Sequence, residues 1–99
     1  QQIWDTAQGL DAYRGSTAMV ITTDHGRGDG REGWKNHGSE LPGSENIWVA
    51  AFGAGVTATG QHHGGSFTQS QIAATVAELL GYDFQASDDR IAEPLPICQ

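Results

Sequence analysis

The sequence predicts a small mixed α/β domain, and three observations carry this prediction. Helical patterns of apolar residues flank two short runs rich in apolar and β-branched residues. These runs lack polar alternation, so we expect strands buried on both faces, as in a mainly parallel sheet. Two strands and two helices are too few to close a covered sheet, because three or more strands are normally needed. We therefore expect an incomplete domain, a piece of a longer protein.

The first half of the chain predicts one helix, one strand and one long loop. Apolar residues recur at helical spacing over residues 3–14, and Gly15 offers a stop for that helix. A strand is expected over residues 17–23. Residues 24–46 then contain six glycines and one proline. A loop of this length in a compact domain is usually functional.

The second half predicts a strand over residues 47–52, a glycine-rich connection and a well-marked helix over residues 69–80. Thr68 suits the N-cap of that helix, and Gln71 three residues later completes a capping box. Gly81 suits its C-terminal stop. The side chains expected to be buried along this helix are Ile72, Val76, Leu79 and Leu80. Residues 82–99 predict an irregular tail.

Composition excludes several classes of protein. The 12 acidic and 5 basic residues give a net charge of −7, which argues against a nucleic-acid partner because phosphate binding requires a basic patch. The same charge is compatible with a domain that holds divalent cations, but taken alone it is more commonly explained by solubility. No apolar run approaches the ~20 residues that span a bilayer. Cys98 is the single cysteine, so no internal disulfide forms.

The first candidate site lies where the strand over residues 17–23 ends. Asp24 and His25 follow that strand directly, and ligands in open α/β sheets bind at the carboxyl ends of strands. Neighbouring side chains on a strand point to opposite faces, so the glycines that follow are needed for the pair to converge on one ion. A carboxylate and an imidazole together suit zinc, manganese or iron better than calcium. An Asp that caps a turn beside a surface histidine is the alternative.

Further candidates lie in the two glycine-rich segments. His37 follows His25 by twelve residues and could complete one metal site or belong to a second ion. His62 and His63 form a pair that suits either a metal or an exposed turn. Arg27 and Arg31 suit a phosphate or sulfate, and otherwise lie in solvent.

Other side chains are expected to play no part in the chemistry. Trp34 and Trp48 are expected to pack rather than to hold a substrate. Thr22 and Thr23 lie in a strand without an activating base, so the chain offers no convincing nucleophile. No phosphate-binding loop, nucleophile elbow or dinucleotide fingerprint is present.

The order of these motifs resembles the C-terminal part of the alkaline phosphatase superfamily, which includes phosphatases, phosphodiesterases, sulfatases and phosphoglycerate mutases. The resemblance covers residues 3–84 and rests on the segments "TAMVITTDHGRG", "WKNHG", "IWVAAFGAGV" and "TQSQIAATVAELLG". It implies part of a three-layer αβα sandwich with a mainly parallel sheet. It also favours a periplasmic or extracellular location.

The resemblance assigns roles residue by residue. Asp24 and His25 match the pair that binds the metal of the nucleophile, and His37 matches a ligand of the second metal. The implied cofactors are two divalent ions, zinc first, with manganese, magnesium or calcium also compatible. The family's Thr or Ser nucleophile and its remaining ligands would lie upstream of residue 1. His62 and His63 match no family ligand, and both are kept with Arg27 as possible substrate or metal contacts.

The expected function is therefore the C-terminal part of a metal-dependent hydrolase of small phosphate or sulfate esters. Its 99 residues supply metal ligands but no nucleophile, so we expect no activity from them alone. The alternative is a small acidic α/β module without catalytic activity that binds a metal or a partner. An exposed sheet edge could also support oligomerisation.

Overall fold

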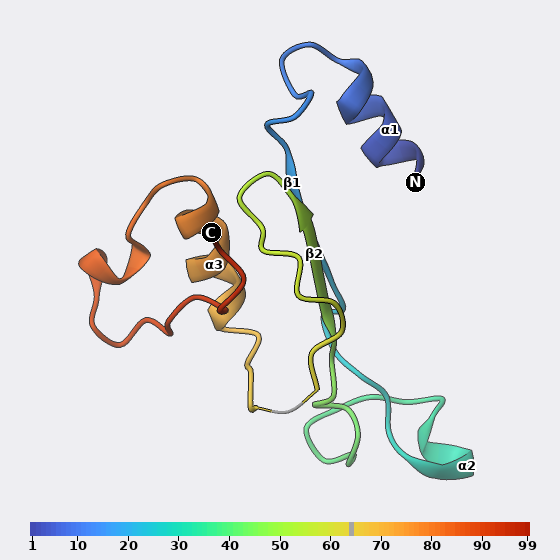
Figure 1. Cartoon of the computed structure of the whole chain (residues 1–99). Helices are drawn as coiled ribbons and strands as arrows, with labels where there is room; N and C mark the ends of the chain where they lie inside the picture. The colour runs from blue at the N-terminus through green and yellow to red at the C-terminus, as the bar shows by residue number, and fades with distance from the viewer. Residues whose placement is uncertain (64) are drawn as a thin grey trace. The chain divides into compact units, whose positions relative to one another are not determined.

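The mixed α/β class is confirmed by the computed structural model, which describes residues 1–63 and 65–99. Figure 1 shows its elements in chain order: α1 (Gln2–Gly9), β1 (Ala18–Thr22), α2 (Gly30–Gly33), β2 (Val49–Gly53), α3 (Gln71–Leu79) and the 3-10 helix η1 (Phe84–Ser87). No helix in these residues is long and apolar enough to cross a membrane.

The two strands pair with each other in antiparallel orientation. At one end of the pair the Ala54 N–H donates to the Thr17 carbonyl at 3.0 Å, and at the other the Thr22 hydroxyl donates to the Trp48 carbonyl at 2.9 Å. The expected parallel pairing is therefore wrong for these two strands. A parallel pair needs a crossover connection, usually a helix, whereas the loop after β1 returns to the same end of the sheet. Across the described ranges no third strand and no three-layer sandwich is present.

The strands are also less buried than their sequences predict. The first three residues of β1 are half-buried and the last two are exposed, and only the central residue of β2 is half-buried. Among the residues that the structure describes, the apolar side chains that reach full burial are Val56, Ala74 and Leu95. The expectation of strands buried on both faces is wrong, because neither strand contains a fully buried residue.

The described residues form two compact units. One combines Gln1–Val20 with Ala51–Gln99, and the other is Ile21–Ala50. Within the first unit, α1 contacts β2 through the Trp4 and Phe52 rings, whose centroids lie 4.9 Å apart edge to face. Gly53 has a φ of +104°, and a Cβ there would collide with the Thr17 carbonyl, so this close approach requires glycine.

Helix α1 ends at Gly9, five residues before its expected end. Leu10 is extended, with φ −99° and ψ 127°, and turns follow it. The Arg14 Nε group donates back to the Gln8 carbonyl at 2.9 Å, and the Gly15 N–H donates to the Gln8 side chain at 3.1 Å. Glycine is a poor helix former, and these bonds satisfy the end of a short helix instead.

Helix α3 begins and ends close to its predicted bounds. The predicted N-cap is wrong: Ser70, not Thr68, is the N-cap, and its side chain makes no capping hydrogen bond. The Gln71 side chain still accepts from the Thr68 N–H at 2.8 Å, which is one half of the expected capping box. Gly81 has a φ of +83°, and the Gly81 and Tyr82 N–H groups donate to the Glu78 and Ala77 carbonyls, each at 2.9 Å. This pair of bonds is a Schellman motif, so the glycine stop is confirmed.

The buried face of α3 differs from the predicted stripe. Ala74 and Thr75 are buried, whereas Val76 is exposed and Leu80 is 69% exposed. Thr75 is 0% exposed: its hydroxyl donates to the Gln71 carbonyl at 2.7 Å and accepts from the Leu95 N–H at 2.8 Å. The C-terminal tail therefore selects the face of α3 that becomes buried.

The tail is more ordered than predicted. It contains η1, which packs against α3, and an antiparallel bridge between Val56 and Cys98. Around the bridge, the Thr57 N–H donates to the Ile97 carbonyl and the Gln99 N–H to the Gly55 carbonyl, both at 2.8 Å. These bonds attach the end of the chain to the segment that follows β2.

Replacing Thr75 by valine should lower the free energy of unfolding by about 1–3 kcal/mol, because the buried Leu95 N–H loses its acceptor. Urea denaturation followed by circular dichroism measures the change. Thr75→Ser keeps the hydroxyl and should retain most of the stability. Thr59→Val, on an exposed residue, is the matched control and should stay within about 0.5 kcal/mol. Equal loss in both valine variants would contradict the role given to Thr75.

Candidate metal site

The loop between β1 and β2 folds onto itself through backbone hydrogen bonds. The Gly26 N–H donates to the Ser44 carbonyl at 2.7 Å, the Gly28 N–H to the Asn36 carbonyl at 3.0 Å, and the Asp29 N–H to the Pro42 carbonyl at 2.8 Å. Residues 26–29 thus lie against two later parts of the same loop. The chain passes so closely at Gly26 that a Cβ there would lie 2.5 Å from the Gly43 carbonyl oxygen.

This folding brings together two of the predicted ligands, His25 and His37. Their rings are stacked, with centroids 3.7 Å apart and planes inclined by 18°. The bond from Gly28 to the carbonyl of Asn36 fixes the backbone immediately before His37. Two histidines twelve positions apart therefore meet because the loop backbone returns to the end of β1.

Asp24 and His25 also lie together. The Asp24 Oδ2 and His25 Nε2 atoms are 3.5 Å apart, and the His25 N–H donates to Asp24 Oδ1 at 3.0 Å. On the other side of the ring, Nδ1 lies 2.7 Å from the Gly26 carbonyl. A carbonyl only accepts, so Nδ1 carries the proton of the neutral ring and Nε2 keeps the lone pair.

The arrangement has the dimensions of a chelating pair. Ligands about 2.0–2.1 Å from a tetrahedral ion lie about 3.4 Å from each other, and the Asp24 to His25 separation is 3.5 Å. The carbonyl that orients Nδ1 is the kind of partner that metal-bound histidines use. The Asp24 side chain is 87% exposed and that of His25 is 37% exposed, so both remain accessible.

The stacked rings do not aim their nitrogens at one common point. A ring nitrogen directs its lone pair within the ring plane, and the two planes are nearly parallel. The described residues contain no group of three or more His, Cys, Asp or Glu side chains that could hold an ion. Each ion would therefore need further ligands.

The candidate arginines differ in their surroundings. The Nη1 group of Arg27 donates to the carbonyls of Trp34 at 3.3 Å and Lys35 at 3.2 Å. Arg27 thus holds the end of α2 in place, a structural role that its position in the sequence did not predict. Arg31 lies on α2 and is exposed.

His62 and His63 belong to the first unit, whereas Asp24, His25 and His37 belong to the second. Both are exposed, and the His62 ring lies 5.9 Å from the Phe67 ring. Neither residue belongs to the loop that brings His25 and His37 together.

Trp34 and Trp48 are 57% and 55% exposed, so the expectation that they pack is wrong. Their backbones are held in place, because the carbonyl of Trp34 accepts from Arg27 and that of Trp48 accepts from Thr22. The backbone of each tryptophan is therefore hydrogen-bonded, while more than half of the residue's surface stays exposed to solvent.

Sequence reasoning missed residues that shape the loop through their backbones. Ser44 is the main example: its carbonyl accepts from Gly26, and its buried hydroxyl accepts from the Gly38 N–H at 3.2 Å. The carbonyl of Asn36 has a similar role. Carbonyl groups are common to all residues, so no side-chain pattern could have identified these positions.

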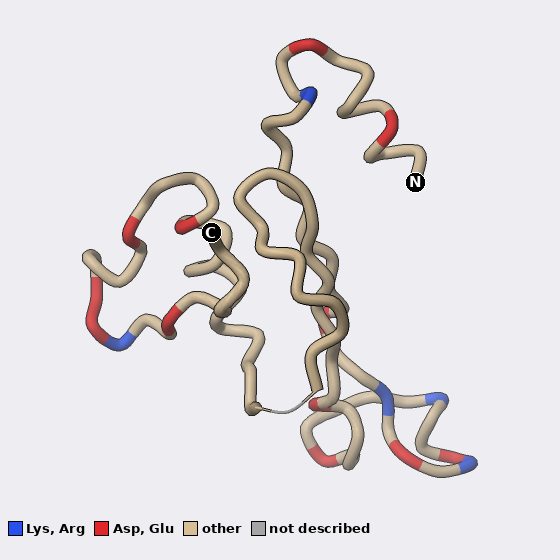
Figure 2. Tube along the Cα trace, viewed as in Figure 1, with Lys and Arg blue, Asp and Glu red and all other residues tan. Residues whose placement is uncertain are grey.

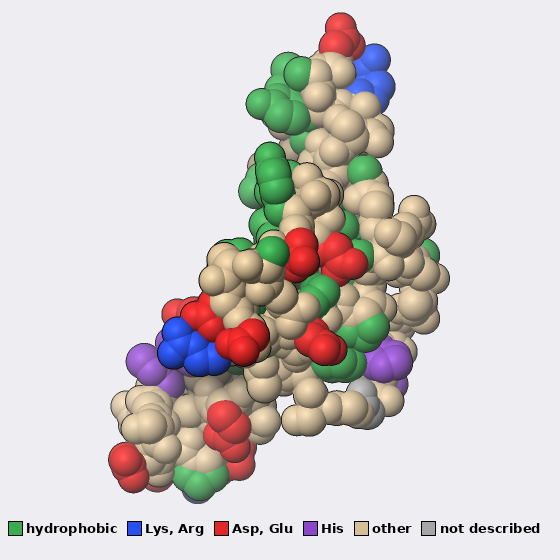
Figure 3. Space-filling view, turned by 90° about the vertical axis from the view of Figure 1, so that its left-hand side faces the viewer, with side chains coloured by type: hydrophobic (Ala, Val, Ile, Leu, Met, Phe, Trp, Pro, Cys, Tyr) green, Lys and Arg blue, Asp and Glu red, His purple; other side chains and the backbone are tan. Residues whose placement is uncertain are grey.

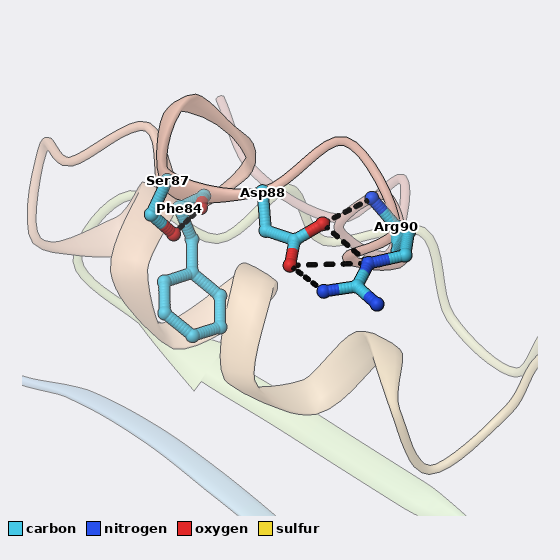
Figure 4. A network of polar contacts seen from close by, with 4 residues as sticks. All are labelled: Phe84, Ser87, Asp88 and Arg90. Atoms are coloured by element: carbon cyan, nitrogen blue, oxygen red, sulfur yellow. Dashed lines mark hydrogen bonds and ion pairs between the residues drawn. The ribbon is translucent and has the colours of Figure 1, made fainter.

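Perturbed pKa values occur outside the loop, in the C-terminal tail. Figure 4 shows the hydrogen bonds and ion pair between Arg90 and Asp88, in which Arg90 Nη2 lies 2.6 Å from Asp88 Oδ2. The hydrogen bonds from Arg90 hold the pKa of Asp88 below its usual value, and those to Asp88 raise the pKa of Arg90. Burial, helped by the charge of Glu78, raises the pKa of the Cys98 thiol. Cys98 is therefore a neutral thiol at pH 7.

Comparison of the chain with protein-family models, curated proteins and solved structures finds no match in any of the three.

Replacing Gly26 by alanine should destabilise the loop by about 1–3 kcal/mol, because the added methyl group meets backbone carbonyls that cannot move aside. The stacking of His25 on His37 should be lost with it. NMR spectra of the histidine ring protons measure this, since stacked rings shift each other's signals. Gly9→Ala is the control, because space is open there, and it should leave the histidine signals unchanged. Unchanged histidine signals in Gly26→Ala would contradict the close approach.

Proposed function

We propose that this chain is the metal-binding C-terminal part of a hydrolase of phosphate or sulfate esters, related to the alkaline phosphatase superfamily. Asp24 and His25 bind one divalent ion, and His37 binds a second. The observation that carries the proposal is the cluster itself: a carboxylate 3.5 Å from an imidazole nitrogen, with a second imidazole stacked at 3.7 Å. The motif order supplies the class of reaction, and the cluster supports the metal ligands.

The proposal extends to the fold of the intact protein. We propose that the two strands belong to a larger, mainly parallel sheet within a three-layer αβα sandwich, in which β1 and β2 form a local antiparallel pair. The exposed strand faces support this, because apolar residues such as Ile21 and Phe52 are exposed on strands that normally need a cover. The uncovered apolar side of α3, with Val76 and Leu80, supports it further.

The donor set fits zinc better than calcium. Imidazole nitrogen and carboxylate oxygen are common zinc ligands, whereas calcium is bound by oxygen ligands. A bound ion of this kind lowers the pKa of a nucleophile and stabilises the leaving oxygen. The residues of this chain orient the donors: Gly26 fixes the ring of His25, and the carbonyl of Asn36 fixes the approach to His37. With two donors for one ion and one for the other, the chain should bind metal weakly and hydrolyse no ester.

Zinc titration tests the ligands directly. Isothermal titration calorimetry should detect zinc binding to the unmodified chain, and His25→Ala or Asp24→Asn should weaken it at least about tenfold, as expected for loss of one ligand of a pair. His37→Ala should remove a second, weaker event. His62→Ala is the matched control, because His62 lies outside the loop cluster, and it should change neither event.

Three results of this titration would contradict the proposed metal site. Zinc binding that survives the His25→Ala and His37→Ala double change would show that other residues hold the ion. No binding in the unmodified chain at saturating zinc would overturn the site as proposed. Binding that depends on His62 and not on His25 would move the site to the other unit.

The reaction class is tested by the sequence that precedes residue 1 in the gene. We expect an early Asp together with a Thr or Ser nucleophile, and a longer protein with these residues should hydrolyse a 4-nitrophenyl phosphate or sulfate ester. A gene that lacks both residues would favour the alternative, an acidic α/β module that binds metal or a partner without catalysis.

A further inference from the structure

A cavity of about 500 Å³ lies between the end of α3 and η1, within the first unit. The residues that line it include two acidic ones, Glu78 and Asp83, and two aromatic ones, Tyr82 and Phe84, which are 70% and 41% exposed. Ligand sites commonly have volumes of about 300–1,000 Å³, with apolar walls and a few polar groups. None of the lining residues is basic. The proposed function of the loop uses none of these residues.

Local chain geometry fixes the walls of the cavity. The Schellman motif at Gly81 sets the direction of Tyr82, and the Asp83 Oδ1 atom accepts from the Ala86 N–H at 3.2 Å, which caps η1. The side chain of Gln85, another lining residue, donates to the Ile91 carbonyl at 3.2 Å. Figure 4 shows the Phe84 ring pointing away from the ion pair of Asp88 and Arg90.

The residues that line the cavity carry negative charge without a basic partner among them. The C-terminus of a helix carries partial negative charge and is usually accompanied by a basic side chain, but the last turn of α3 contains Glu78 and no basic residue. The nearest arginine in the sequence, Arg90, is already bound by both oxygens of Asp88. Acidic side chains gather on this face of the molecule (Figure 3). The raised pKa of Cys98 agrees with this, because the charge of Glu78 contributes to it.

We propose that this cavity binds a small organic cation of the alkylammonium class. Glu78, Asp83 and the helix terminus attract the positive charge, and the rings of Tyr82 and Phe84 contact the alkyl groups. Carboxylates attract any cation, but aromatic faces favour one with apolar substituents, which is the basis of quaternary ammonium recognition. A hydrated metal ion would gain little from the two rings.

Choline and its neutral isostere 3,3-dimethylbutan-1-ol distinguish a cation site from a merely apolar one. Titration of the full chain, followed by the amide NMR signals of residues 78–86, should saturate with choline and not with the alcohol. Glu78→Gln and Phe84→Leu should each weaken choline binding about three- to thirtyfold. Glu40→Gln removes one negative charge from the other unit and should leave the affinity unchanged.

Three results would overturn the proposal. Equal weakening by Glu40→Gln would show general attraction to a negatively charged protein. Equal binding of the alcohol would show that charge has no part. Displacement of choline by equimolar calcium, with no effect of Phe84→Leu, would show a metal-ion site. Asp83→Asn, which retains an oxygen to cap η1, separates loss of charge from loss of the turn. It should weaken choline binding with the NMR signals of η1 preserved.

Discussion

The hydrogen bond from the Gly26 N–H to the Ser44 carbonyl, at 2.7 Å, is the contact on which the loop depends. It joins Gly26, the residue after His25, to Ser44, eighteen positions later. Position 26 requires glycine, because a Cβ there would collide with backbone carbonyls of the opposing segment. Because the loop contains almost no buried apolar side chain, its shape comes from backbone bonds of this kind and not from packing. The stacked histidines and Asp24 are therefore positioned chiefly by the main chain of the loop.

The first unit is held differently, by a small core in which a polar group is central. Thr75 is fully buried and connects α3 to the C-terminal tail through the Leu95 N–H, and the buried apolar side chains of the described residues are Val56, Ala74 and Leu95. Such a core covers one face of α3 and leaves Val76 and Leu80 exposed. Exposed apolar faces of this kind are costly in water. The apolar pattern of α3 predicts that Val76 and Leu80 are buried, whereas the described residues leave both side chains exposed.

Local signals were predictable from the sequence, whereas long-range choices were not. Gly81 acts within one helical turn, so its position predicted the end of α3 correctly. The start lies two residues later than predicted, with Ser70 and not Thr68 as the N-cap. The approach of His25 and His37 also followed from their common loop. The antiparallel pairing and the buried face of α3 depend on which distant segments of the chain pack against them. The periodicity of apolar residues within one element does not identify those segments. The early end of α1 depends on the turn after it, in which the Arg14 guanidinium donates to the Gln8 carbonyl.

The negative charge of the chain extends to the loop that carries the candidate metal ligands. Three of the five basic residues, Arg27, Arg31 and Lys35, lie in residues 24–46, but the same segment contains five acidic residues, so its net charge is −2. Figure 2 marks the basic and acidic positions along the trace. The Lys35 ammonium lies 3.8 Å from a Glu32 carboxylate oxygen, and the Arg27 guanidinium donates to the carbonyls of Trp34 and Lys35. The loop's own charge therefore does not attract an anion, and the proposed ester substrate depends on the bound ions for that attraction.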